Sequence, residues 1–180
     1  MRVDRCWTAQ DENMGVTLRV ATEGDLAAIN RIYNHYVLCS TCTYQEEPST
    51  EVERAAWFAE HAQSGGKHPV TVVVDEKGEV VGWGSLSRFH ARCAYRFTVE
   101  DSVYVDKGHQ RRGIGRMILV DLLERARVLG HKQVIALISA DQMPSVALHR
   151  ELGFVEAGLL RGVGVKFGKV LDVVYMQWSA

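Results

Sequence analysis

The sequence contains no apolar run long enough to span a membrane and no secretory signal at its start. A membrane helix needs about 20 consecutive apolar residues, and the apolar stretches here are far shorter. The opening residues are mostly polar and lack the apolar core of a signal peptide. We therefore expect a cytoplasmic protein without membrane contact, in which residues 1–15 form a loosely ordered extension and residues 16–180 a single domain.

The sequence also lacks an excess of charge of either sign. Its 180 residues include 21 lysines and arginines and 22 aspartates and glutamates, which gives a formal net charge of -1. This balance argues against broad electrostatic binding to nucleic acid or to an anionic membrane, so any anion-binding site must be local. With 47% hydrophobic residues, the chain is suited to one domain with a sizeable core.

Cysteines are few, and their spacing gives little support for metal or redox chemistry. They lie at positions 6, 39, 42 and 93, and Cys39 and Cys42 form a CxxC pair preceded by His35. A zinc site would need a fourth ligand, usually from a second paired element, and a thioredoxin-like site would place CxxC at the start of a helix that follows a strand. Here the pair follows a predicted helix. We expect reduced, packed or substrate-lining thiols and no bound metal.

Two common nucleotide-binding motifs are missing, but another glycine-containing pattern is present. The sequence has neither the Gly-Lys-Ser/Thr ending of a P-loop nor the three glycines and later acidic residue of a dinucleotide fold. The run Gln110-Arg111-Arg112-Gly113-Ile114-Gly115 joins a predicted strand ending at Val105 to a predicted helix. Glycines and a basic pair at a helix N-terminus let backbone N–H groups approach an anion closely. The pattern favours a pyrophosphate cradle, and the alternative is a tight turn with a solvated basic pair.

Periodicity and capping signals predict a mixed α/β domain. Alternating or β-branched segments predict strands at 18–20, 70–74, 80–86, 97–105, 134–138, 154–161 and 171–178. Helical spacing predicts helices that begin near Thr22, Thr50, Ile114 and Pro144. The resulting order, βααβββαβαββ, indicates a central sheet covered by helices and differs from the regular alternation of a doubly wound fold.

Several segments resemble a known enzyme family. The run from Gln110 to Gly115 matches the Q/R-x-x-G-x-G/A acetyl-CoA motif of GNAT-type N-acetyltransferases. The segments 95–105, 148–154 and 164–168 are similar to the phosphinothricin acetyltransferase group, which includes enzymes acting on methionine sulfoximine and methionine sulfone. This resemblance covers residues from about 18 to 177. It implies the GNAT acyl-CoA N-acyltransferase fold, in which a mostly antiparallel sheet with splayed fourth and fifth strands is flanked by helices.

The same resemblance implies how the donor, acetyl-CoA, is bound. The pantetheine arm enters between the splayed strands, and a backbone N–H of Val103 or Val105 stabilises the developing oxyanion. Gln142 stands where such sequences often carry asparagine, so it keeps the amide but lengthens its reach. The implied acetyl-CoA-binding residues are Val103, Tyr104, Val105, Gln110, Arg111, Arg112, Gly113, Ile114, Gly115, Arg116, Gln142 and Ser145.

Two residues are candidates for proton transfer. A protonated amine must lose a proton before it attacks a thioester, and Glu100 occupies the family's matching position on the polar face of strand 97–105. Glu100 is therefore the candidate general base, acting directly or through water; spacing alone would favour a structural carboxylate paired with an arginine. His149 falls where the family has a histidine near the coenzyme thiol, and it is the candidate acid or water ligand; an ordinary helix histidine making one polar contact is the alternative. Tyr104 is a second possible proton donor.

The acceptor implied by the resemblance is a small amino-acid-like amine. Guanidinium and ammonium groups bind oxyanions, although surface solvation is the alternative for each such residue. Val170 stands where such sequences often carry tryptophan, which removes an aromatic wall and affects the preferred substrate. The candidate substrate-binding residues are Tyr33, Asn34, Arg88, Phe89, Arg96 and Lys166, with Arg92 as a further anion partner and Tyr95 shaping the pocket.

Other functions remain compatible with the sequence. The acceptor can be another primary amine, such as a different amino acid, a polyamine or a protein N-terminus. A CoA-binding module without turnover is a second alternative, against which the presence of Glu100 argues. A ping-pong route through Cys42 or Cys93 would need an activated thiolate, so direct transfer is simpler. The resemblance also implies a homodimer.

Overall fold

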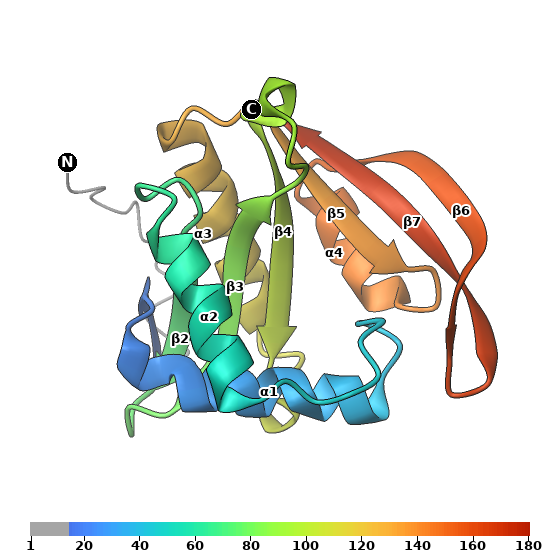
Figure 1. Ribbon diagram of the computed structural model, residues 1–180. Helices are drawn as coiled ribbons and strands as arrows, with labels where there is room; N and C mark the ends of the chain where they lie inside the picture. The colour runs from blue at the N-terminus through green and yellow to red at the C-terminus, as the bar shows by residue number, and fades with distance from the viewer. Residues whose placement is uncertain (1–14) are drawn as a thin grey trace.

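The computed structural model describes residues 15–180, so the predicted extension lies outside the described residues apart from Gly15. The elements are β1 (Val16–Val20), α1 (Leu26–Cys39), α2 (Glu51–Ala62), β2 (Val70–Asp75), β3 (Val80–Arg88), β4 (Thr98–Val105), α3 (Ile114–Val128), β5 (Gln133–Ser139), α4 (Met143–Glu151), β6 (Val155–Lys166) and β7 (Lys169–Ser179). Short 3-10 turns lie at Glu23–Asp25, Cys93–Tyr95 and Lys107–His109. The predicted order βααβββαβαββ is confirmed (Figure 1). No helix within residues 15–180 is both long and apolar enough to cross a membrane.

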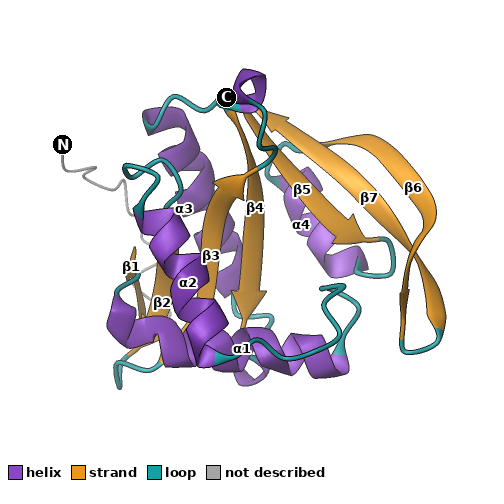
Figure 2. Cartoon of the chain, viewed as in Figure 1, coloured by secondary structure: helices purple, strands orange, loops and turns teal. Residues whose placement is uncertain are grey.

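The strands form one seven-stranded sheet of order β1-β2-β3-β4-β5-β7-β6 (Figure 2). Neighbouring strands in it are antiparallel except β4 and β5, which are parallel. These two strands pair only from Thr98 with Gln133 to Glu100 with Ile135. Beyond that point they diverge towards α1, as Figure 1 shows. The predicted fold with splayed fourth and fifth strands is therefore confirmed.

Helices cover both faces of the sheet. On one face, the apolar stripe of α3 buries Ile118, Leu119 and Leu122 in a core that also includes residues of α4. On the other face, Ile29 and Ile32 of α1 pack into a second, smaller core, with α2 alongside. Each helix thus removes one apolar stripe from water, which holds the three layers together.

The connection between α1 and α2, residues 40–50, crosses from one side of the splay to the other. The hydroxyl of Thr41 donates a 2.7 Å hydrogen bond to Oδ2 of Asp141, just before α4. The ammonium of Lys166, at the end of β6, donates to the backbone oxygen of Thr43 at 2.7 Å. These bonds fix the connection over the gap between β4 and β5.

The hairpin of β6 and β7 differs from the prediction at one end. The predicted strand ended at residue 161, but β6 continues to Lys166 and turns through Phe167 and Gly168, which have φ values of 51° and 71°. Positive φ at both central residues is typical of a tight two-residue hairpin. Gly164 interrupts the alternating strand pattern of the sequence. The structure requires glycine there because Tyr44 packs closely against it, and a Cβ would lie 2.3 Å from Cε2 of Tyr44.

Candidate active site

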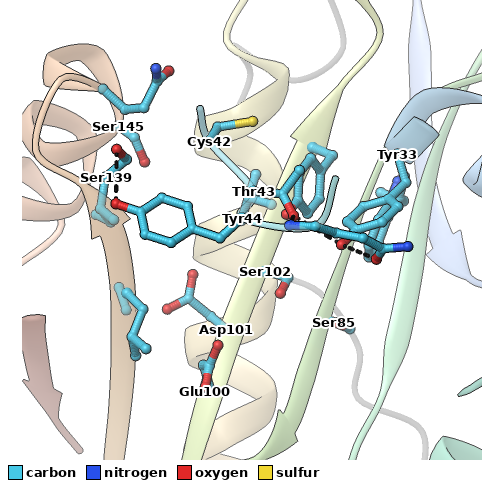
Figure 3. A pocket seen from close by; sticks show the side chains of 18 of the residues that line it. Tyr33, Cys42, Thr43, Tyr44, Ser85, Glu100, Asp101, Ser102, Ser139 and Ser145 are labelled. Carbon is cyan, nitrogen blue, oxygen red and sulfur yellow. Dashed lines mark hydrogen bonds between the residues drawn. The ribbon is translucent and has the colours of Figure 1, made fainter. Parts of the chain in front are cut away.

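A cavity of about 510 Å³ occupies the space that the divergence of β4 and β5 opens. Tyr44 closes one side by reaching from the α1–α2 connection to β5, where its hydroxyl donates to Oγ of Ser139 at 3.3 Å (Figure 3). Because β4 has no neighbour here on the β5 side, side chains from both of its faces line the cavity. Glu100 lies on the same face as Tyr104, and Asp101 lies on the face covered by α4.

Glu100 sits at the last residue pair before the strands part. Its side chain is half-buried and lines the cavity. Burial raises the pKa of Glu100, and the neighbouring charge of Asp101 raises it further. No ion pair within residues 15–180 involves Glu100. A carboxyl group with a raised pKa that faces a cavity is suited to accept a proton from a bound amine.

His149 is held between two acceptors on the other face of β4. Nε2 lies 3.1 Å from Oδ2 of Asp101, and Nδ1 lies 2.7 Å from the backbone oxygen of Ser145. Burial alone would lower the pKa of His149, but the hydrogen bond and charge of Asp101, together with the hydrogen bond to Ser145, outweigh it, so the pKa is raised. With an acceptor at each nitrogen, this geometry favours the imidazolium, which donates from both.

Aromatic side chains form the wall of the cavity next to Glu100. Trp83 and Tyr104 are stacked, with ring centroids 4.8 Å apart, and Tyr33 meets Tyr104 edge to face at 5.3 Å. The hydroxyl of Tyr33 also donates to Oε1 of Gln45 at 2.9 Å. Burial raises the pKa of Tyr104 well above its usual value, so its phenol stays protonated. Tyr104 therefore adds no charge to the wall.

The predicted site residues separate into those that line the cavity and those that do not. The structure brings together Tyr33, Glu100, Val103, Tyr104, Gln142, Ser145 and His149 at the cavity. It places Asn34, Arg88, Phe89, Arg96, Val105, Lys166 and the loop residues 110–116 outside the lining. Asn34 instead exchanges two 2.9 Å hydrogen bonds with the backbone of Ser49, and Lys166 holds the α1–α2 connection.

The predicted pyrophosphate cradle lies at the N-terminus of α3. Gly113 caps the helix with a φ of 81°, and Arg111 also has a positive φ of 60°. Arg111 and Arg112 are exposed, whereas Gln110 donates from Nε2 to the hydroxyl of Tyr36 at 2.7 Å. A left-handed glycine, exposed basic side chains and a helix N-terminus fit the pyrophosphate of acetyl-CoA.

The two cysteines of the CxxC pair lie in different surroundings. Cys39 is exposed, and Cys42 lines the cavity, where burial raises the pKa of its thiol. Cys93 is exposed on the β3–β4 connection. Residues 15–180 contain no cluster of three or more histidine, cysteine or acidic side chains that could hold a metal ion. A raised pKa keeps the Cys42 thiol protonated, which is unfavourable for a nucleophile.

Sequence reasoning missed Arg54, which lines the cavity from α2. Its side chain is buried, with only 5% of the residue exposed. In the sequence it stands between Glu53 and two alanines in a capped helix, where an arginine is typical of a solvated face. No motif marks it, because two of the three rings around it, Tyr33 and Trp83, come from α1 and β3.

The strand order, with its splayed parallel pair, is that of the acyl-CoA N-acyltransferase fold, which defines the class of protein. The model of the acetyltransferase (GNAT) family matches residues 29–154. The chain is 38% identical to the L-methionine sulfoximine/L-methionine sulfone acetyltransferase of Salmonella typhimurium, covering 90% of this chain and 93% of that protein. It is 36% identical to the phosphinothricin N-acetyltransferase of Alcaligenes faecalis, over 89% and 81% of the two chains.

A solved structure agrees with these sequence matches. The phosphinothricin acetyltransferase of Sinorhizobium meliloti, in complex with acetyl-CoA, is 41% identical and has a TM-score of 0.88, with 92% of this chain and 88% of that chain covered. The chain therefore belongs to the GNAT acetyltransferase family, and it is an acetyltransferase.

Proposed function

We propose that this enzyme transfers the acetyl group of acetyl-CoA to the α-amine of a small amino acid, such as methionine sulfone, methionine sulfoximine or phosphinothricin. The observation that carries the proposal is Glu100, a carboxyl group with a raised pKa at the narrow end of the cavity. The names of the related enzymes support an amino-acid acceptor. A cavity of about 510 Å³ is also of the size that takes small ligands.

The two proton transfers of the reaction are assigned to residues on opposite faces of β4. Glu100 accepts the proton of the ammonium group, so that the neutral amine attacks the thioester carbonyl directly. Backbone N–H groups of β4 beyond Glu100, at Val103 or Val105, face no partner strand on the β5 side and stabilise the oxyanion. His149, held in its charged form by Asp101, gives a proton to the departing thiolate. It regains one through water from the attacking nitrogen, which loses its second proton as the intermediate collapses to the amide. Acetyl-CoA supplies the activated acetyl group.

The donor's phosphates are assigned to the N-terminus of α3. Gly113 and Arg111 both have positive φ, a backbone form that suits an anion-binding turn, and the exposed Arg111 and Arg112 side chains add positive charge. Gln142 and Ser145 approach from the start of α4. These residues hold the donor and contribute nothing to the choice of acceptor.

The function is tested by following free thiol release from acetyl-CoA with a panel of amines. We expect L-methionine sulfone, L-methionine sulfoximine and L-phosphinothricin to release thiol, and the product to be N-acetylated by mass spectrometry. A polyamine and a peptide with a free N-terminus should react much more slowly. If only these latter amines react, the amino-acid assignment is wrong; binding of acetyl-CoA without turnover of any amine would favour a CoA-binding module.

We also propose that the enzyme is a homodimer that associates through the β6–β7 hairpin. β6 is an edge strand, and its hairpin exposes large apolar side chains at Val155, Leu160, Val163, Val165, Phe167 and Val170. Apolar side chains gathered on an exposed sheet edge are typical of a protein interface. A second copy of the chain, as the family resemblance implies, is the partner that would cover them.

Val165→Glu is expected to convert the dimer to a monomer, because a charge placed in an apolar interface has no partner there. Val165 is 63% exposed in the single chain, so the substitution should leave its fold intact. Sedimentation equilibrium measures the mass. Val52→Glu on α2 is the matched control, since Val52 is 79% exposed and lies away from the hairpin. A wild-type enzyme that sediments at the mass of one chain would contradict the proposal.

A further inference from the structure

Arg54 is a buried cation without a counter-charge in the described part of the chain. Its guanidinium carbon lies 4.6 Å from the ring centroid of Tyr33 and 4.8 Å from that of Trp57. Its Nε donates to Oδ1 of Asn30 at 3.2 Å, and no ion pair within residues 15–180 includes it. Burying an arginine without a carboxylate is costly, and an anionic ligand would offset that cost.

The neighbouring carboxylate, Glu53, is already engaged. Its Oε2 accepts from the backbone N–H and the hydroxyl of Thr50, at 2.8 and 2.9 Å, in the capping box of α2. The rings around Arg54 hold the guanidinium in place by stacking. Its terminal N–H groups are not engaged by a salt bridge within residues 15–180. Arg54 is therefore fixed at the cavity with donors available to an anion.

Further unpaired donors line the same cavity. Oγ of Ser85 and Nε1 of Trp83 are buried, and neither has a hydrogen-bond partner within residues 15–180. The ring of Trp83 lies 5.8 Å from the guanidinium carbon of Arg54. Buried donors without partners are rare in folded proteins because each costs free energy, and a ligand acceptor removes that cost.

The position of Ser85 relative to Glu100 indicates which anion this site binds. Ser85 pairs with Ser102 across β3 and β4, and Ser87 pairs with Glu100, so Ser85 and Glu100 are diagonal neighbours on one face. Diagonal neighbours lie about 7–8 Å apart. The α-carboxylate of an amino acid sits on the carbon that carries the amine. An anion site this close to the base therefore suits that carboxylate better than a distant head group.

We propose that Arg54, with the hydroxyl of Ser85, binds the α-carboxylate of the acceptor amino acid and thereby selects amino acids over other amines. This inference rests on the proposed function for its acceptor class. Arg54 orients the substrate so that its ammonium group faces Glu100. The charges in the site then balance, because the substrate's carboxylate pairs with the Arg54 guanidinium and its ammonium group with the Glu100 carboxylate.

The test compares Arg54→Met with the wild-type enzyme on L-methionine sulfone and on its carboxamide. The sulfone head group is uncharged, so the α-carboxylate is the only anion and the carboxamide removes it. We expect Arg54→Met to raise KM for the acid by about 10- to 100-fold, the loss typical of a hydrogen bond to a charged group, with kcat little changed. KM for the carboxamide should stay nearly the same. An equal loss for both acceptors, or a wild-type enzyme that does not distinguish them, would overturn the proposal.

Arg127→Met on α3 is the matched control. Arg127 also stacks on an aromatic ring, with its guanidinium carbon 4.7 Å from the Trp178 centroid, but it is exposed and outside the cavity. Its kinetics should equal those of the wild type. If Arg54→Met does not fold, Arg54→Lys and Ser85→Ala replace it, each with a smaller rise in KM for the acid alone.

A binding measurement separates this inference from the proposed function. Calorimetry of the acid and the carboxamide with CoA-saturated enzyme needs no turnover. If the acid binds in a way that depends on Arg54 but is not acetylated, the carboxylate site is supported and the proposed reaction is wrong. Failure of the wild-type enzyme to bind the acid would overturn the carboxylate site, even where other amines are acetylated.

Discussion

Replacing Glu100 with glutamine is expected to lower kcat by about 10²- to 10⁴-fold, the usual contribution of a general base. Glutamine keeps the size of the side chain and its position at the last pair before β4 and β5 diverge, but it cannot accept the proton of the ammonium group. Binding of acetyl-CoA should be unaffected, because the donor's phosphates are assigned to the N-terminus of α3. Steady-state kinetics and calorimetry with acetyl-CoA measure the two effects separately.

The pH dependence gives a second readout for the same residue. Because burial raises the pKa of Glu100, the acid limb of the kcat/KM profile should lie above the ordinary range of a glutamate, with activity rising as the carboxyl group ionises. Glu100→Gln should lose this limb. Glu79→Gln, at an exposed turn before β3, is the control and should match the wild type. A normal kcat in Glu100→Gln would remove the base assignment.

Gly84→Ala is expected to destabilise the fold by about 2–3 kcal/mol, as overpacking of a well-filled core does. A Cβ at this position of β3 would lie 2.4 Å from Cγ2 of Ile118 on α3 and 2.9 Å from the backbone oxygen of Ser102 on β4. The backbone oxygen cannot rotate away, so β3, β4 or α3 must move. For a chain of this size the melting temperature should fall by roughly 5–10 °C, which thermal unfolding measures.

Gly158→Ala is the matched control for this substitution. Gly158 lies in β6, its φ is outside the left-handed region, and a Cβ there would meet nothing within 4 Å. Its melting temperature should stay near that of the wild type. Equal stability of the two variants would show that β3 and α3 can separate freely, which would contradict the tight packing of Ile118 and Leu122 against the sheet.

The arrangement of elements was largely predictable because it depends on local patterns. Alternation along β4 placed Glu100 and Tyr104 on one face and Asp101 on the other, and the structure has them so. The capping box at Thr50 and Glu53 was also visible in the sequence and is present at the start of α2. Such features depend on neighbours within a turn or a strand, so their spacing carries the information.

The anion partners of the acceptor were less predictable. Sequence reasoning chose Arg88, Arg96 and Lys166 from their motifs, but the structure places these outside the cavity lining. Their role in substrate binding stays a prediction. Arg54 had no signal, because the rings that surround it come from three different elements.

The sequence by itself determined the order of elements, the two faces of β4 and the glycine-containing turn before α3. Only the tertiary structure decided which charges meet. It brought Asp101 to His149, 48 residues away, and it buried Arg54 near Trp83, in the cavity that Ser85 also lines. The physical reason is that burial and partner charge depend on the packing of distant segments, whereas helix and strand patterns depend on nearby residues.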